Sequence, residues 1–282
     1  MDKVAIVGAG TMGSGIGYVT ATRGYQTGLY DLYPEMLEKA RAYHKKLVDR
    51  AVEKGRLTLE GADGYWGRVL YTGDLGTALS GASLVIEAVP ERMALKKDIL
   101  QQIEKLSPSN ALLGSNTSSL SITELASAMA DPGRLIGIHF FNPAPVMKLV
   151  EIVVGLDTRQ ETVGAVVNFV KSIDKESVIV KDLPGFVTTR VGMMLISEAI
   201  FAYQEDIAEK EDLDKAMKLG YNLPMGPLAL ADLVGLDVVL NVLDALFENY
   251  KDPRYRAPIL LRKMVQAGRL GRKTGEGFYK YA

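Results

Sequence analysis

The chain has 282 residues, enough for two domains of ordinary size, and its 48% hydrophobic content provides material for a core in each. The 33 basic and 34 acidic residues leave a formal charge of −1, which argues against nucleic acid or an anionic membrane as a partner. The absence of cysteine excludes disulfides, thiolate catalysis and cysteine metal sites, and it fits a cytoplasmic protein. Because the first strand pattern begins within three residues and no apolar run reaches membrane-spanning length, we expect neither a signal peptide nor a membrane anchor.

Residues 3–31 predict a strand, a turn, a helix and a second strand. Residues 4–7 are rich in β-branched side chains, which is typical of a buried parallel strand. A helical pattern then runs to about residue 23, and a second strand is expected over 27–30. The turn between the first strand and the helix has the spacing G-x-G-x-x-G. It consists of Gly8, Gly10, Thr11, Met12 and Gly13.

This turn predicts a dinucleotide site. Gly8 permits a tight turn, Gly10 lets a pyrophosphate approach the backbone, and Gly13 allows the helix to pack closely on the strand. Asp31, at the end of the second strand, is placed to hold two ribose hydroxyls and to repel a 2′-phosphate, which favours NAD over NADP. The glycine pattern alone leaves open a flavin or a turn without a ligand.

Residues 34–54 predict a long polar helix. Its lysines indicate a solvated face, with contact to a phosphorylated substrate as the alternative, and His44 is expected to be solvated as well. A strand near residues 68–71 and a short helix at 74–79 are predicted next.

Two further strands end in polar residues. The strand at 84–86 leads into Glu91, and Lys96 lies just inside the next helix. The two residues fit either contacts to a cofactor or the ordinary beginning of a helix, where an acidic residue such as Glu91 suits the helix dipole. The strand at 111–114 is followed by five polar side chains, residues 115–119, before a helix at about 121–129. Since one helix cap needs fewer hydroxyls, we expect one or two of them to face a ligand.

His139 lies in the predicted strand 134–140, and a proline-rich turn leads to another strand at 149–154. If the two strands pair as an antiparallel hairpin, Glu151 lies alongside His139. A carboxylate that fixes an imidazole tautomer suits general acid–base chemistry, although a lone strand histidine is more often a core residue. No histidine or glutamate spacing indicates a metal site.

A helix at 162–172 and a strand at 177–180 complete an α/β domain with a Rossmann-type, mostly parallel sheet, which we assign to residues 1–183. Residues 184–282 carry only helical patterns and predict an all-α C-terminal domain, with helices at 187–209, 211–218, 227–233, 238–250 and 258–267. Their wide apolar stripes indicate burial against a partner. The glycine-rich tail fits either a cap and turn or a segment that closes on the cofactor.

The chain resembles the short-chain L-3-hydroxyacyl-CoA dehydrogenases, particularly the bacterial 3-hydroxybutyryl-CoA dehydrogenases. The matching segments run nearly end to end: VAIVGAGTMGSGI, VIEAVPE, SNTSSLSI, IGIHFFNPAPVMKLVEIV, KDLPGF, MGPLALADLVGLDV and GRKTGEGFY. The resemblance implies an N-terminal NAD domain, a C-terminal helical domain that forms a homodimer, and oxidation of the 3-hydroxyl of an acyl-CoA with hydride transfer to NAD.

The resemblance also implies roles for individual residues. His139 corresponds to the general base and Glu151 to its orienting carboxylate. Ser118 corresponds to a serine that reaches the substrate hydroxyl and the nicotinamide, and Asn142 to an asparagine beside the nicotinamide.

Further matches concern the cofactor and CoA. Glu91 and Lys96 correspond to ribose and amide contacts, Lys273 to a C-terminal lysine on the cofactor, and Lys54 to a CoA-contacting lysine. One position departs from the family pattern: Thr189 stands where an asparagine usually lines the substrate pocket. This change keeps open an NAD dehydrogenase for a hydroxy or sugar acid without CoA. A second alternative, a non-catalytic NAD-binding protein, does not need both His139 and Glu151.

Overall fold

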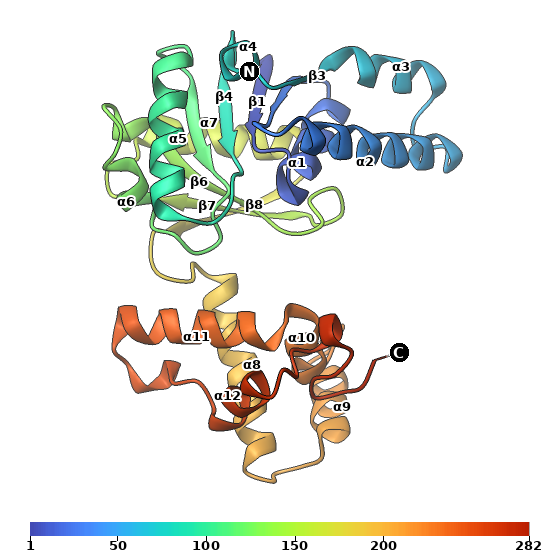
Figure 1. Cartoon of the computed structure of the whole chain (residues 1–282), viewed down its shortest axis with the longest axis vertical. Helices are drawn as coiled ribbons and strands as arrows, with labels where there is room; N and C mark the ends of the chain where they lie inside the picture. Colours follow the sequence, from blue (N-terminus) through green and yellow to red (C-terminus); the bar gives the residue numbers. More distant parts are fainter. Residues whose placement is uncertain (282) are drawn as a thin grey trace. The chain divides into compact units, whose positions relative to one another are not determined.

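The computed structural model describes residues 1–281 and divides into two compact units, one ending at Leu183 and the other beginning at Pro184. The first unit is a sheet covered by helices, and the described part of the second is helical (Figure 1). The fold class expected from the sequence, a mostly parallel α/β domain followed by an all-α domain, is confirmed.

One eight-stranded sheet forms the centre of the first unit, in the order β3-β2-β1-β4-β5-β6-β7-β8. All neighbours are parallel except β6 and β7, which form the antiparallel hairpin expected around His139. The strands are β1 (Lys3–Val7), β2 (Gln26–Tyr30), β3 (Val69–Thr72), β4 (Leu84–Glu87), β5 (Leu112–Ser115), β6 (Leu135–Phe140), β7 (Leu149–Val154) and β8 (Glu176–Lys181).

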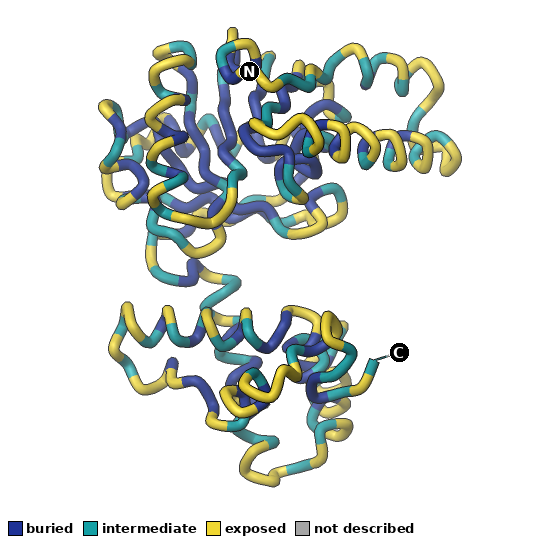
Figure 2. Tube along the Cα trace, in the orientation of Figure 1, coloured by how far each residue is buried: buried dark blue, intermediate teal, exposed yellow. Residues whose placement is uncertain are grey.

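Helices cover both faces of this sheet. Apolar side chains of α1, α2 and α7 share one core with alternate residues of β1, β4, β6 and β7, whereas α4 contacts β1, β2 and β3, α5 contacts β4, and α6 contacts β6. Figure 2 shows the central strands largely buried and most of α2 and α3 exposed or partly exposed, whereas the edge strands β3 and β8 are mostly exposed or partly exposed. The helices are α1 (Thr11–Thr22), α2 (Pro34–Glu53), α3 (Leu59–Arg68), α4 (Leu75–Leu79), α5 (Met93–Leu106), α6 (Ile122–Ala126) and α7 (Gln160–Ser172), with a 3₁₀ turn η1 (Pro132–Arg134).

The second unit packs its helices around a core of its own, which includes Ile196, Leu228 and Leu243. The buried carboxylate of Asp232 accepts hydrogen bonds from the backbone N–H groups of Phe278 and Tyr279, which fixes the end of the chain to this core. The elements are α8 (Thr188–Gln204), α9 (Lys210–Gly220), α10 (Pro227–Val234), α11 (Leu236–Tyr250), α12 (Ile259–Gln266), η2 (Pro253–Tyr255) and η3 (Arg272–Thr274).

Three helices differ from the sequence expectation, and one of them, α8, ends at Gln204 rather than near residue 209. Helix α3 has no counterpart in that expectation, because glycines at 61, 64 and 67 lower the intrinsic helix propensity of this stretch. The helix forms because the Thr58 hydroxyl caps it and Tyr65 is buried. Helix α6 ends at Ala126 rather than near residue 129. No helix within residues 1–281 is long and apolar enough to cross a membrane.

The expectation that His44 is solvated is wrong, because its side chain is completely buried. Nε2 donates to the backbone carbonyl of Ser14 in α1 at 2.7 Å, and Nδ1, whose single lone pair is then the acceptor, lies 2.6 and 2.8 Å from the hydroxyl oxygens of Tyr71 and Tyr65. Tyr18 adds a tilted ring contact at a centroid distance of 6.0 Å. His44 therefore links α2 to α1, α3 and β3.

This environment predicts an acid-sensitive contribution to stability. Burial lowers the pKa of His44 to about 4, against a smaller opposing effect of its bond to the Ser14 carbonyl. The unfolded chain then binds a proton near pH 6.5 that the folded chain binds only near pH 4, so stability falls as the pH drops through that window. The loss from this group is about 3 kcal/mol. Urea unfolding at neutral pH and near pH 4 should show this loss in the wild type and not in His44→Gln; equal losses in both would contradict it.

Candidate active site

The glycine turn after β1 has the geometry that a bound pyrophosphate requires. Gly8 has φ +107°, and a Cβ there would lie 2.7 Å from the Ala88 carbonyl oxygen. A Cβ on Gly13 would lie 1.7 Å from the Gly8 carbonyl oxygen, so only glycine allows α1 to begin this close to the strand. Nothing lies within 4 Å of the Cβ position of Gly10, which leaves the turn accessible to a ligand.

The beginning of α1 also fits a phosphate. Gly10 provides no side-chain cap, and no acidic residue lies in the first turn. The N–H groups of this turn, which includes the exposed Thr11 and the half-buried Met12, therefore face outward from a positive helix end. Asp31 lies beside them, and its Oδ2 accepts from the Ala9 N–H at 2.7 Å. The residues predicted from the fingerprint thus lie together and fit an NAD cofactor.

Glu91 and the polar turn after β5 also lie together. Oε1 of Glu91 accepts from the Thr117 hydroxyl at 2.5 Å and from the N–H groups of Ser118 and Ser119 at 2.9 and 3.1 Å. Burial tends to raise the pKa of Glu91, but Lys96 and these donors outweigh burial and lower it. Ser118 itself is exposed. A charged carboxylate therefore holds the turn that presents Ser118.

His139 and Glu151 face each other across the β6–β7 hairpin, in direct register. The two atoms His139 Nδ1 and Glu151 Oε2 are 2.8 Å apart, and the exposed fractions of the residues are 7% and 0%. The ring of Phe141 lies 4.5 Å from that of His139, centroid to centroid. Asn116 joins this hairpin to the β5 turn, because its Oδ1 accepts from the Phe140 N–H at 3.0 Å. A buried carboxylate on Nδ1 suits an imidazole that exchanges protons at Nε2.

The remaining predicted residues have different surroundings. Asn142 is exposed on the turn after β6, and Lys54 is exposed at the end of α2. Thr189 lies in the first turn of α8 and is partly buried. Lys273 is paired with both carboxylate oxygens of Asp237. Thr189 and Lys273 belong to the second unit, and the others belong to the first.

Lys96 occupies a buried position rather than a surface that faces a ligand. It is 1% exposed, and its ammonium lies 2.7 Å from Glu87 Oε1 and 3.2 Å from both Glu91 Oε2 and the Val89 carbonyl oxygen. Glu87 is a residue that the sequence reasoning did not single out. The available signal was a carboxylate that ends the apolar run of β4, with a lysine nine positions later.

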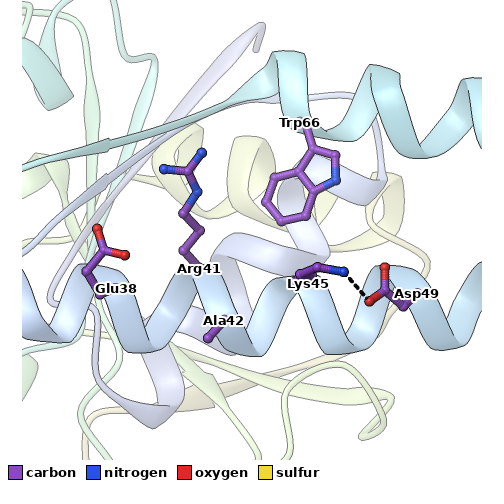
Figure 3. A pocket seen from close by; sticks show the side chains of 6 residues that line it. All are labelled: Glu38, Arg41, Ala42, Lys45, Asp49 and Trp66. Carbon is purple, nitrogen blue, oxygen red and sulfur yellow. Dashed lines mark hydrogen bonds and ion pairs between the residues drawn. The ribbon is translucent and has the colours of Figure 1, made fainter.

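Two surface cavities lie away from all of these residues. One, of about 400 Å³, opens beside α2 and is lined by Glu38, Arg41, Ala42, Lys45, Asp49 and Trp66 (Figure 3). The second, of about 500 Å³, includes Ser83, Leu112 and Arg134 at the amino-terminal ends of the strands. Ligands of parallel sheets bind at the opposite, carboxyl ends, where the predicted site residues of the first unit lie, except Lys54 at the C-terminal end of the 20-residue helix α2. Within residues 1–281, no group of three or more potential metal ligands is present.

Comparison with known proteins agrees with this geometry. The family described as "3-hydroxyacyl-CoA dehydrogenase, NAD binding domain" matches residues 3–183, and "3-hydroxyacyl-CoA dehydrogenase, C-terminal domain" matches residues 185–281. The 3-hydroxybutyryl-CoA dehydrogenase of Clostridioides difficile is 43% identical over 279 residues, covering 99% of each chain. The crystal structure of (S)-3-hydroxybutyryl-CoA dehydrogenase from Ralstonia eutropha has 42% identity and a TM-score of 0.97, covering 100% of this chain and 99% of that one. The chain therefore belongs to the 3-hydroxyacyl-CoA dehydrogenase family, and residues 3–183 form its NAD-binding domain.

Proposed function

We propose that this protein oxidises the 3-hydroxyl of a short (S)-3-hydroxyacyl-CoA, such as 3-hydroxybutyryl-CoA, to the ketone, and also catalyses the reverse reduction. The observation that carries the proposal is the buried His139–Glu151 pair at the carboxyl end of the sheet of an NAD-binding domain. Relatives that share about two fifths of the sequence over the full chain are named for this reaction.

In the proposed mechanism His139 is the general base. Its Nδ1–H donates to Glu151, so that the neutral ring carries its basic lone pair on Nε2. Nε2 takes the proton of the substrate hydroxyl while C3 loses a hydride, and the carbonyl forms. NAD supplies the hydride acceptor. Glu151 stabilises the imidazolium that results, and in the reverse direction His139 returns the proton to the ketone oxygen.

Other residues hold the reactants in place in this proposal. Ser118 positions the substrate hydroxyl and the nicotinamide end, Asn142 the nicotinamide, and the glycine turn with Asp31 the other end of NAD. Glu91 acts indirectly, because its carboxylate holds the turn that carries Ser118. In the second unit, Thr189 would contact the acyl group and Lys273 the cofactor.

CoA binding and assembly complete the proposal. Lys54, exposed at the end of α2, offers a positive charge to the phosphates of CoA. We expect residues 184–282 to form a homodimer interface, because exposed apolar side chains such as Val191 and Val238 remain on α8 and α11. A cytoplasmic location, without nucleic acid or membrane partners, fits the near-neutral charge.

The decisive experiment measures NADH consumption with acetoacetyl-CoA, and in parallel NAD reduction with free 3-hydroxy acids and sugar acids. We expect turnover with the CoA thioester and NADH. Turnover with a free acid alone would favour the second candidate, a dehydrogenase for a substrate without CoA, which Thr189 keeps open. Cofactor binding without turnover of any substrate, with NADH or NADPH, would overturn the catalytic proposal.

A further inference from the structure

Glu87 and Lys96 form a buried ion pair beneath the site. Their exposed fractions are 0% and 1%, and Lys96 Nζ lies 2.7 Å from Glu87 Oε1. Burial raises the pKa of the Glu87 carboxyl, and the Lys96 ammonium acts against that rise. Because the desolvation of two charges offsets much of their attraction, a buried pair of this kind adds little stability by itself. The contacts of the Glu87–Lys96 pair instead support a role in positioning the residues around it.

The Glu87 carboxylate joins three elements at the carboxyl end of the sheet. Its Oε1 accepts from the Val89 N–H at 2.7 Å and from Lys96 of α5, and its Oε2 accepts from the Ser115 hydroxyl at the end of β5 at 2.6 Å. Both oxygens are thus engaged inside the protein. Glu87 defines where Lys96 lies relative to the β5 turn.

Lys96 passes this constraint to Glu91. An ammonium has three protons, and Lys96 has three acceptors here: Glu87 Oε1, the Val89 carbonyl and Glu91 Oε2. The other oxygen of Glu91 holds the backbone N–H groups of Ser118 and Ser119. A continuous series of charged contacts therefore runs from Glu87 to Ser118.

We propose that Glu87 is a positioning residue that acts through Lys96 and Glu91 to hold the turn carrying Ser118. This inference rests on the proposed function only for the role of Ser118 at the reacting hydroxyl. Lys96, in this arrangement, serves the turn from inside the protein. A small movement of a residue that orients a reactant lowers turnover strongly, because the reaction depends on a narrow range of geometries.

A double-mutant cycle tests this inference. Glu87→Gln retains the shape and one acceptor oxygen but removes the charge that holds Lys96. We expect kcat for acetoacetyl-CoA reduction to fall about tenfold to a hundredfold, with NADH affinity at the wild-type level. In a Ser118→Ala background, the same substitution should lower kcat by less than about twofold, because the residue through which it acts is gone.

Glu104→Gln is the matched control, because Glu104, on α5, is another carboxylate that holds a turn, accepting from the N–H groups of Ala130 and Asp131 at 2.8 Å each. None of the described hydrogen bonds of the Ser118 turn involves Glu104. We expect Glu104→Gln to leave kcat unchanged. A purely structural role of Glu87 would instead lower kcat equally in both Ser118 backgrounds.

Hydrogen exchange provides a readout that needs no substrate. The amides of Ser118 and Ser119 should exchange faster in Glu87→Gln than in the wild type, and at the wild-type rate in Glu104→Gln.

If Glu87→Gln does not fold, the doubly neutral Glu87→Gln/Lys96→Met variant is used, since it leaves no unpaired buried charge. Equal kcat losses in both backgrounds, an unaffected kcat, or unchanged exchange at these amides would overturn the inference. Failure of the wild type to reduce acetoacetyl-CoA would overturn the proposed function instead, while the exchange result still decides the role of Glu87.

Discussion

Replacement of His139 by glutamine is expected to lower kcat for acetoacetyl-CoA reduction by about 10²–10⁴, the usual contribution of a positioned general acid–base. Glutamine is similar in size and can still bond Glu151, so the β6–β7 hairpin is retained. It cannot exchange a proton near neutral pH. Steady-state NADH oxidation gives kcat, and fluorescence titration gives NADH affinity, which should remain at the wild-type level.

The chain contains a matched control for this substitution, because it has only two histidines. His44→Gln makes the same change at a buried histidine that bonds Ser14 and two tyrosines. It should reduce stability and leave kcat within a few-fold of the wild type. Survival of acetoacetyl-CoA reduction within tenfold in His139→Gln would end the general-base assignment.

The features that the sequence predicts well are those set by local chemistry. The bounds of β1, α1 and β2 agree with expectation to within one or two residues, because glycine spacing, β-branched runs and Gly24 each act locally. The pairing of His139 with Glu151 follows from an antiparallel hairpin whose strands are joined by the proline-rich segment 141–148, together with the alternation of side chains along each strand.

The features that it predicts poorly depend on contacts between distant segments. His44 lies in a polar helix and is followed by Lys45 and Lys46, and its burial comes from Tyr65 and Tyr71, which reach it from α3 and β3. The sequence does not predict helix α3 for the same reason, because the stability of this helix comes from burial of Tyr65 rather than from helix propensity. Glu87 ends a buried strand, and only the position of Lys96 in the folded chain reveals its partner.

The proposed role of Thr189 cannot be judged from local chemistry. Thr189 belongs to the second unit, and the predicted reaction centre belongs to the first. A threonine hydroxyl lacks the separate donor and acceptor groups of an asparagine amide, whatever the surrounding fold. The proposed reaction therefore rests on His139, Glu151 and the family.

Replacement of Glu151 by glutamine is expected to lower kcat for oxidation of 3-hydroxybutyryl-CoA by about 10²–10⁴, and by no more than His139→Gln does, because the carboxylate acts through the imidazole. The amide of glutamine can donate to Nδ1, which favours the tautomer that carries its proton on Nε2, and this tautomer cannot accept the substrate proton. Glu151 is 0% exposed, so water cannot replace the lost charge beside the imidazolium.

The double variant distinguishes a paired role from two separate roles. If Glu151 acts only through His139, then His139→Gln/Glu151→Gln should have nearly the kcat of His139→Gln alone, because residues that act as a unit are not additive. NADH affinity should be retained in all three variants, and Glu104→Gln again provides a control for loss of a carboxylate. A double variant whose loss equals the product of the two single losses would mean that Glu151 acts independently of the imidazole, and the proposed mechanism would then have to assign it a different partner.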